Sequence, residues 1–376
     1  MNGVSLLPDL PIGARVLIVR LRSLGDIVLL TPSLRLLKEW RPDLRFSVVA
    51  EKRFHPLLAG NPNLEEVLDA GEGRCWQKPA RELRAALDLR KRNFSLCVNL
   101  HGGPTSAFLT RLSGARWKAG FEHFRNSGLY DILIPDARRI LNQAIVHTAE
   151  HQASAFFWLG LPRRRIPAAE LFVSPAAEAR WNEVLKRLEV TEYALLHPPA
   201  LYATKAWPAE RFARLGRYFE EEMALSTVFS CGPGESPSLD EVESASGHPI
   251  RRLDQPELSV FMASISRARL FVGNDSGPAH MAAAFERPLV VIFGSSNSKI
   301  WHPWAGSRIE ADGPSLGAES SFRVVENAYE CNPCPGDRCY RFAQPECILS
   351  ITFEQVRAAV DSLLNPVSGA SGLRST

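Results

Sequence analysis

With 376 residues the chain exceeds the usual size of one domain, so we expect two domains of about 150 to 200 residues each. Hydrophobic residues make up 45% of the chain and charged residues 23%, which is typical of a folded globular protein and excludes a largely disordered one. The formal net charge of +3 gives no footprint of nucleic-acid binding, and no stretch reaches the roughly 18 consecutive apolar residues that span a bilayer.

The first residues lack the charged-then-apolar order of a signal peptide, so we expect a cytoplasmic protein without a transmembrane segment. Seven cysteines are an odd number, which argues against a full disulfide framework.

The first half of the chain alternates short apolar runs with helical patterns. Residues 15–21 form a β-branched run, and apolar residues then recur at helical spacing over 27–37. Further strands are expected at 45–50, 66–69 and 96–100, with a helix over 79–92. This alternation predicts parallel βα units with helices on both faces of a sheet.

A second series of the same kind follows. Its strands are expected at 193–197, 226–231, 249–253, 270–272 and 289–293. Between the series, the proline-rich and weakly periodic residues 161–175 are the best linker, which predicts domains over 1–174 and 175–364. Residues 365–376 are small and polar, and we expect a disordered tail there.

Doubly wound domains carry their ligand loops at the carboxyl ends of the strands. If two such domains face each other, the predicted active site is the central cleft. The basic run over 81–92 is interpreted as a solvated helix face, with a contact to anionic lipid as the alternative.

Asp26 follows the first strand, after a glycine and at the start of a helix. One interpretation is a helix N-cap, because a carboxylate there accepts unpaired backbone N–H groups. The other is a general base, which needs a carboxylate held on rigid backbone. Both can hold together.

The segment 271–280, FVGNDSGPAH, is a strand, a glycine-bearing turn and the start of a helix with Pro278 at its first position. Free N–H groups at such a start bind anions, and a diphosphate is the natural ligand. The alternative is a plain capped turn with Asp275 or Ser276 as the cap.

Lys205 stands alone in a loop after a predicted strand, where its charge can neutralise a leaving phosphate or simply face solvent. Residues 231–235, CGPGE, form another glycine turn, and Glu235 could receive ribose hydroxyls, although such turns are common.

Two sequence patterns suggest a metal-binding site. His147 to His151 matches the H-x-x-E-H motif of inverzincin peptidases, but five residues match easily by chance. Cys331, Cys334, Cys339 and Cys347 suggest either structural zinc or cysteines that are reduced or partly paired in a packed loop. The prediction is that no metal is used in catalysis.

Several of these segments, taken in order, resemble the heptosyltransferases of glycosyltransferase family nine. They are VRLRSLGDIVLLTP from residue 19, NLHGGPTS from 99, LSGA from 112, TKAWPAERF from 204, GPGE from 232, GNDSGPAH from 273, Phe293-Gly with Trp301, and the cysteine-rich stretch. The resemblance covers residues 15 to 355. It implies a GT-B fold and inverting, metal-independent transfer of L-glycero-D-manno-heptose from ADP-heptose to the lipopolysaccharide inner core.

The same resemblance implies roles for single residues. Asp26 falls on the family's general base and Lys205 on its diphosphate-contacting lysine. The predicted donor-binding residues are Ser23, Gly25, Thr204, Glu235, Asp275, Ser276, Gly277 and His280. The implied partners are ADP-heptose, used as donor substrate with no further cofactor, and the lipid A-core acceptor at the inner face of the cytoplasmic membrane.

The chain departs from the family at Pro199, which stands where a glycine is usual. Proline has no N–H and a fixed φ, so one potential phosphate donor is lost. Three alternatives therefore stay open: another nucleotide sugar or acceptor on the same fold, a catalytically silent nucleotide-sugar-binding scaffold, and a metallopeptidase built on His147. Retention of Asp26 and Lys205 argues against the scaffold.

Overall fold

The computed structural model describes residues 4–71, 78–306, 321–334 and 336–364, and the predicted tail over 365–376 lies outside them. The described chain divides into two compact units. Unit 1 holds residues up to Ser174 together with a short return segment that begins at Trp304. Unit 2 holds Pro175–Pro303 and the C-terminal residues that follow the return segment.

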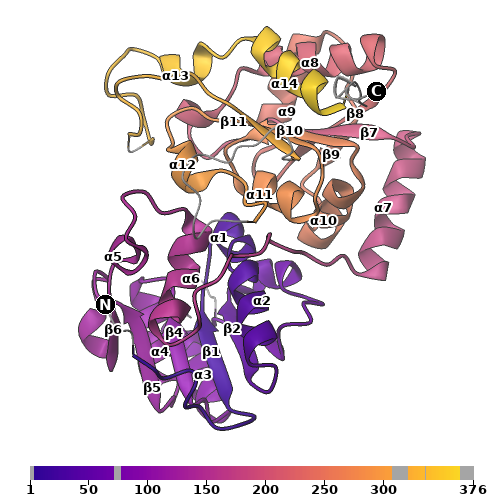
Figure 1. Cartoon of the computed structure of the whole chain (residues 1–376). Coiled ribbons are helices and arrows are strands. Elements are labelled where there is room, and N and C mark those ends of the chain that lie inside the picture. Colours follow the sequence, from indigo (N-terminus) through magenta and orange to yellow (C-terminus); the bar gives the residue numbers. More distant parts are fainter. Residues whose placement is uncertain (1–3, 72–77, 307–320, 335, 365–376) are drawn as a thin grey trace, which may run out of the picture. The chain divides into compact units, whose positions relative to one another are not determined.

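Unit 1 is built on six parallel strands in the order β3-β2-β1-β4-β5-β6 (Figure 1). The strands are β1 (Arg15–Val19), β2 (Arg45–Ala50), β3 (Glu66–Asp69), β4 (Leu96–Asn99), β5 (Trp117–Phe121) and β6 (Ile132–Ile134). The helices are α1 (Leu24–Val28), α2 (Thr31–Trp40), α3 (Lys78–Arg90), α4 (Pro104–Leu112), α5 (Ala137–Leu141) and α6 (Thr148–Trp158), with 3₁₀ turns η1 (Lys52–Leu57) and η2 (Ser127–Leu129).

Unit 2 repeats this plan with the order β12-β11-β10-β7-β8-β9, again all parallel. Its strands are β7 (Tyr193–His197), β8 (Ser226–Cys231), β9 (Arg252–Asp254), β10 (Leu270–Asn274), β11 (Leu289–Ile292) and β12 (Phe322–Val325). Its helices are α7 (Pro175–Leu188), α8 (Ala209–Glu222), α9 (Ser236–Ser246), α10 (Leu258–Arg267), α11 (Gly277–Ala284), α12 (Ser298–Trp301), α13 (Glu346–Leu349) and α14 (Phe353–Leu364), with η3 (Ala203–Lys205).

The strand order explains where polar residues gather. In each sheet the first strand of the unit lies near the middle, and the order reverses beside it, between β1 and β4 and between β7 and β10. Loops on either side of this reversal leave the carboxyl edge in opposite directions and open a crevice there. The loop after β1 and the loops after β7 and β10 therefore occupy the binding position of their own unit.

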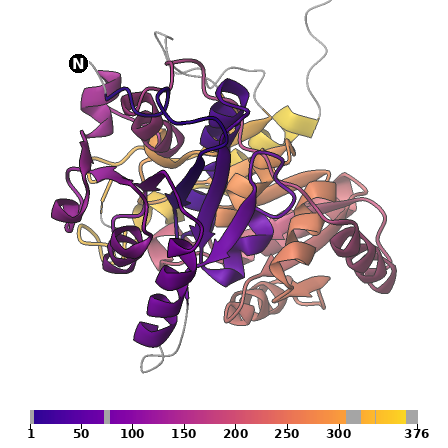
Figure 2. The same ribbon diagram turned by 90° about the horizontal axis from the view of Figure 1, so that it is seen from below.

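Helices cover both faces of each sheet, so the central strands are buried and apolar throughout. The residues of β1 after Arg15 and all of β7 and β10 are buried. Because both faces are covered, these strands read as continuous apolar runs and show no alternation. In the view of Figure 2, α3 runs along the outside of the unit 1 sheet.

The predicted strands are present, with the one expected at 249–253 found as β9 over Arg252–Asp254, but one helix break and three strands were missed. The helix expected over 27–37 is divided into α1 and α2, with Pro32 at the start of the second. The edge-side strands β5, β6 and β12 were not predicted, because each is only three to five residues long and has exposed or half-buried positions.

Gly120 shows how tightly the outer part of the unit 1 sheet is packed. A Cβ at this position would lie 2.6 Å from Cδ2 and 2.8 Å from Cζ of Tyr130. The Tyr130 ring is held in turn by Asn99, whose side-chain amide donates to the hydroxyl at 3.0 Å.

We predict that Gly120→Ala lowers the free energy of unfolding by about 1 to 3 kcal/mol, because the methyl group overpacks against a ring that is held in place. Equilibrium urea unfolding measures the change. Gly128→Ala is the matched control, since nothing lies within 4 Å of a Cβ there. Equal effects of the two substitutions would contradict the packing argument.

Candidate active site

Asp26 lies in the first turn of α1, directly after the loop that leaves β1. Ser23 is the N-cap, and its backbone N–H and its hydroxyl donate to Asp26 Oδ2 at 3.2 and 2.9 Å. The prediction that Asp26 is the N-cap is wrong, because the carboxylate reaches back from the third helical position as the acid of a capping box. Gly25 is buried between them.

Arg20 is the main partner of Asp26, and its importance was missed by the sequence analysis. Its guanidinium forms an ion pair with Asp26 Oδ1 and also donates to the carbonyl of Leu100. Burial lowers the pKa of Arg20, while the Asp26 carboxylate acts in the opposite direction. The arginine stays charged. It therefore links the loops after β1 and β4 and fixes the direction in which Asp26 points.

Two histidines of unit 1, His101 and His151, lie within range of the charges of this ion pair. Burial lowers the pKa of His101, and the positive charges of Arg20 and Arg22 act in the same direction. Burial also lowers the pKa of His151, from 6.5 to about 4, and its ring stacks on Phe121 with centroids 4.3 Å apart.

The H-x-x-E-H motif forms a helix start. His147 is the N-cap of α6, where Nδ1 accepts from the N–H of Ala149 at 3.1 Å, and the Glu150 carboxylate accepts from the N–H of His147 at 2.9 Å. The His147 ring also stacks on Trp304 at 4.6 Å. In the residues that the structure describes, no three His, Cys, Asp or Glu side chains are grouped so that they could hold a metal ion. The motif has a capping and packing role.

In unit 2, Lys205 ends the short turn η3 and forms an ion pair with Asp275, with Nζ 2.8 Å from Oδ2. The same carboxylate oxygen accepts from the hydroxyl of Ser296 at 2.5 Å. Asp275 is 7% exposed and Lys205 23%, so the pair is largely shielded from solvent. Lys205 and the turn after β10 thus belong to one charged cluster.

Asn274, at the end of β10, holds the lysine loop in place and was also missed. Its side chain is fully buried, donates to the carbonyl of Pro198 at 2.6 Å and accepts from the N–H of Trp207 at 3.1 Å. These two bonds join the ends of the loop that carries Lys205. The signal was present in the sequence, because Asn274 stands next to Asp275 where a strand becomes a turn.

The N-terminus of α11 begins at Gly277, with Ser276 as N-cap and Pro278 at the second helical position. The Ser276 hydroxyl makes no capping bond and is buried without a hydrogen-bond partner among the described residues. His280 lies one turn further on and is 6% exposed. The helix start therefore presents backbone N–H groups and a hydroxyl that suit an anionic ligand.

Glu235 is the N-cap residue of α9, but its carboxylate accepts from the N–H of Gly232 at 2.8 Å within its own turn. Beside this turn lies a cavity of about 270 Å³, lined in part by Pro199, Trp207 and Glu235. Pro199 is thus on the wall of this cavity, beside Glu235.

Thr204 connects the lysine loop with the cysteine-rich loop. Its hydroxyl donates to the carbonyl of Gly336 and accepts from Ser295 Oγ at 3.1 Å. The N–H of Cys334 donates to the Ser295 carbonyl at 3.2 Å. Thr204 is 2% exposed and is occupied by these contacts.

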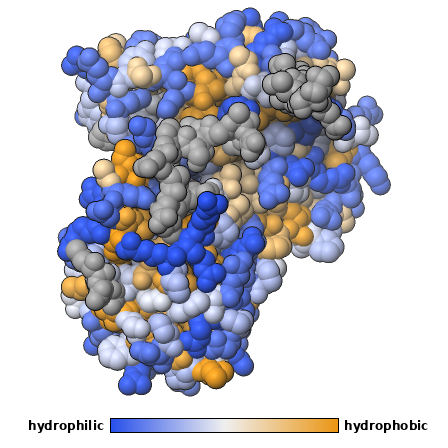
Figure 3. Space-filling view, in the orientation of Figure 1, coloured by the Kyte–Doolittle hydropathy of each residue, from blue (hydrophilic) through white to orange (hydrophobic). Residues whose placement is uncertain are grey.

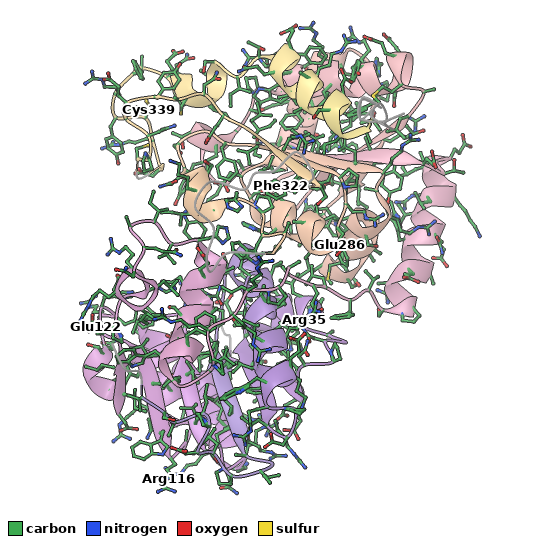
Figure 4. All side chains as sticks on the ribbon, viewed as in Figure 1. Arg35, Arg116, Glu122, Glu286, Phe322 and Cys339 are labelled. Carbon is green, nitrogen blue, oxygen red and sulfur yellow. The ribbon has the colours of Figure 1, made fainter. Side chains whose placement is uncertain are left out.

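The four clustered cysteines Cys331, Cys334, Cys339 and Cys347 are free thiols of unit 2. The first three lie in a loop, on which Figure 4 labels Cys339, and Cys347 lies in α13. Together they line a cavity of about 240 Å³. Burial raises the pKa of Cys347, and the nearby charges of the other three act in the same direction. The choice between structural zinc and cysteines that are reduced or partly paired stays a prediction.

A family model described as glycosyltransferase family 9 (heptosyltransferase) matches residues 83–326. The protein belongs to this family, which confirms the family predicted from the sequence. It is therefore a glycosyltransferase.

Known relatives extend the match over most of the chain. Lipopolysaccharide heptosyltransferase 3 of Escherichia coli (strain K12) is 26% identical over 306 residues, which cover 77% of this chain and 85% of the relative. A solved glycosyl transferase family 9 protein from Veillonella parvula DSM 2008 has a TM-score of 0.79 at 21% identity and covers 94% and 98% of the two chains. A solved E. coli heptosyltransferase with ADP has a TM-score of 0.67 at 19% identity, covering 93% and 99%. The predicted α/β class, with two doubly wound domains of the GT-B kind, is confirmed.

We predict that Arg20→Gln lowers the free energy of unfolding by about 3 kcal/mol, because it leaves the Asp26 carboxylate without its cation. Urea unfolding measures the loss. Arg22→Gln is the control, since its side chain is 62% exposed and is expected to change stability by less than about 0.5 kcal/mol. A loss no larger than that of the control would show that the ion pair is not structural.

We predict a pH dependence of stability from His151. Its folded pKa of about 4 lies below the ordinary 6.5, so between these values the unfolded chain binds a proton that the folded chain does not. Stability is complete above the ordinary pKa and is lost as the pH falls, by about 2 kcal/mol between about pH 7.5 and about pH 5. Urea unfolding at both pH values should show a smaller loss for His151→Gln. Identical losses would contradict this origin.

Proposed function

We propose that the protein transfers L-glycero-D-manno-heptose from ADP-heptose to a hydroxyl of the lipopolysaccharide inner core, with inversion and without a metal. The observation that supports the proposal is the cluster of Lys205, Asp275 and the α11 N-terminus, which brings together an ammonium group and a helix start that could stabilise a leaving diphosphate. Membership of the family supports sugar transfer. The names of the relatives described above support heptose as the sugar, lipopolysaccharide as the acceptor and ADP as the nucleotide.

In the proposed mechanism, unit 1 holds the acceptor and Asp26 removes the proton from its attacking hydroxyl. Ser23 and Arg20 keep the carboxylate in one orientation, which general-base catalysis requires. The carboxylate would take up the proton as the hydroxyl oxygen begins to bond to the anomeric carbon.

In unit 2, the diphosphate of the donor would displace the Lys205 ammonium from Asp275. A carboxylate repels phosphate, so we propose that Asp275 accepts hydrogen bonds from sugar hydroxyls while Lys205 contacts the diphosphate. Ser276, Gly277 and His280 would complete the donor site. Glu235 would contact the ribose, and Thr204 would position Lys205.

Pro199 favours one alternative, a donor with a different nucleotide. It lines the cavity beside Glu235 and offers no N–H to a phosphate. The fold and the roles of Asp26 and Lys205 are the same under this alternative, and only the substrate changes.

We further propose a cytoplasmic protein at the inner face of the membrane, where a lipid-linked acceptor is available. Among the residues described, no helix is both long and apolar enough to span a bilayer.

Calorimetry in EDTA with ADP-heptose, ADP, UDP-sugars and GDP-sugars tests the donor. We expect binding of the ADP ligands alone, weakened about 10- to 100-fold by Lys205→Ala because a charged hydrogen bond is lost. The exposed Lys186→Ala on α7 is the control and should bind normally. Preference for another nucleotide would overturn the heptose donor, and no binding at all would overturn the proposed transfer.

Single-turnover transfer to a soluble core acceptor tests Asp26. We expect Asp26→Asn to bind ADP-heptose normally and to lose about 100-fold or more in rate, because the general base is removed. Full activity of this variant would remove Asp26 from its proposed role, whatever the donor.

A further inference from the structure

The outer surface of unit 1 carries an apolar and basic strip on α3 and α4. Its apolar members are Leu83, Leu87 and Phe108, which are 47%, 52% and 37% exposed. Its basic members are the exposed Arg84, Arg90 and Arg111. We call these six residues the α3–α4 strip.

The two helices lie side by side and run in the same direction. Near their starts, the Thr105 hydroxyl donates to Glu82 Oε1 at 3.0 Å. Near their ends, a Cβ on Gly114 would lie 2.8 Å from Cγ of Arg90. The members of the strip therefore belong to one continuous surface.

Helical geometry places the apolar side chains next to one another. Ala86 and Leu89 of α3 are buried against the sheet, so Leu83 and Leu87, one turn apart, lie on the outward side that turns toward α4. Leu109 of α4 is buried, and Phe108 is on its outward side toward α3.

This arrangement differs from an ordinary solvated helix face. A solvated face carries polar and charged residues, whereas here two leucines stand at neighbouring outward positions with arginines around them. An acid beside them, Asp88, is paired with Lys91. No ion pair involves Arg84, Arg90 or Arg111 in the described parts of the chain. On the face drawn in Figure 3, apolar residues of unit 1 stand among hydrophilic ones. Exposed leucines are therefore common on this protein and do not by themselves indicate a binding surface. The distinguishing feature of the strip is the unpaired arginines beside its leucines.

We infer that the α3–α4 strip docks unit 1 onto an anionic lipid surface. Leucine and phenylalanine enter the boundary between headgroups and acyl chains, and the arginines attract anionic headgroups. A protein partner with the same complementarity would need acidic side chains around an apolar groove, while a bilayer presents both features over any area.

The position of the strip suits a lipid-linked acceptor, and to that extent the inference rests on the proposed function. The loop that enters α4 contains His101, and the carbonyl of Leu100 just before it accepts from Arg20. One end of the strip thus adjoins the loop that Arg20 links to Asp26. A bilayer bound to the strip would place an acceptor at the level of the lipid headgroups next to that loop.

The test is co-sedimentation of the full chain with vesicles of phosphatidylcholine alone or mixed with phosphatidylglycerol. We expect the unaltered protein to bind the anionic vesicles only. The double variant Leu83→Gln with Leu87→Gln should bind at least about ten-fold more weakly, because half-exposed leucines no longer enter the interface. Arg84→Gln with Arg90→Gln should remove the preference for anionic lipid.

Leu133→Gln, on the edge strand β6 of the same unit, is the matched control because Leu133 is 49% exposed. It should bind vesicles normally, and circular dichroism should show all variants folded. Failure of the unaltered protein to bind either vesicle, normal binding by the double leucine variant, or equal loss in the control would each overturn the inference. Self-association through the strip in place of vesicle binding would also overturn it.

The experiment separates this inference from the proposed function. If vesicle binding follows the strip but no heptose is transferred, the docking surface stands and the proposed reaction fails. If a soluble core acceptor is modified but vesicles are not bound, the reaction stands and the docking surface fails. When both hold, the leucine variant should lose transfer to acceptor embedded in vesicles and keep transfer to soluble acceptor.

Discussion

Both units depend on the same constraint, which is that every strand in each sheet runs parallel to its neighbours. Parallel strands need crossover helices, the helices bury both faces of the sheet, and the polar loops are left at its edges. The carboxyl edge beside the reversal of strand order is where Asp26 lies in unit 1 and where Lys205 and Asp275 lie in unit 2. The rigid strands below hold these side chains in place.

Each unit then fixes its charged group with a partner of opposite sign. Arg20 holds Asp26 from the loop just after β1, and Asp275 holds Lys205 from the neighbouring loop. A partly buried charge without a partner would destabilise the fold, so these pairs have a structural role before any ligand arrives. The consequence for catalysis differs between the units. In the proposed mechanism Asp26 is oriented by its partner, whereas Lys205 would exchange its partner for the diphosphate.

The cysteine-rich loop adds a second support to the lysine loop. Through Thr204 and Ser295 it bonds to the segment just before Lys205. A change in the loop would therefore be transmitted to the charged cluster by hydrogen bonds and not through solvent. The cysteines of this region are part of how the site is built, although none of them lies in the charged cluster itself.

The sequence by itself determined the doubly wound plan, since buried strands such as 15–19 and 193–197 are apolar without alternation and helical patterns stand between successive strands. It also determined the family, because several motifs occur in the right order, and it singled out Asp26, Lys205 and the turn at Asp275 as chemically significant. Short edge strands escaped because three to five half-exposed residues carry too little pattern.

Only the tertiary structure decided which partner each of these groups has. Arg20 and Leu100 are 80 residues apart, and Lys205 and Asp275 are 70 residues apart, so no local pattern could relate them. The structure likewise decided that Asp26 is the third residue of a capping box, that His147 caps a helix, and that Leu83 and Phe108 share one surface. Sequence patterns record which side chains a local segment must bury, whereas contacts between distant segments follow from how the strands are ordered in the sheet.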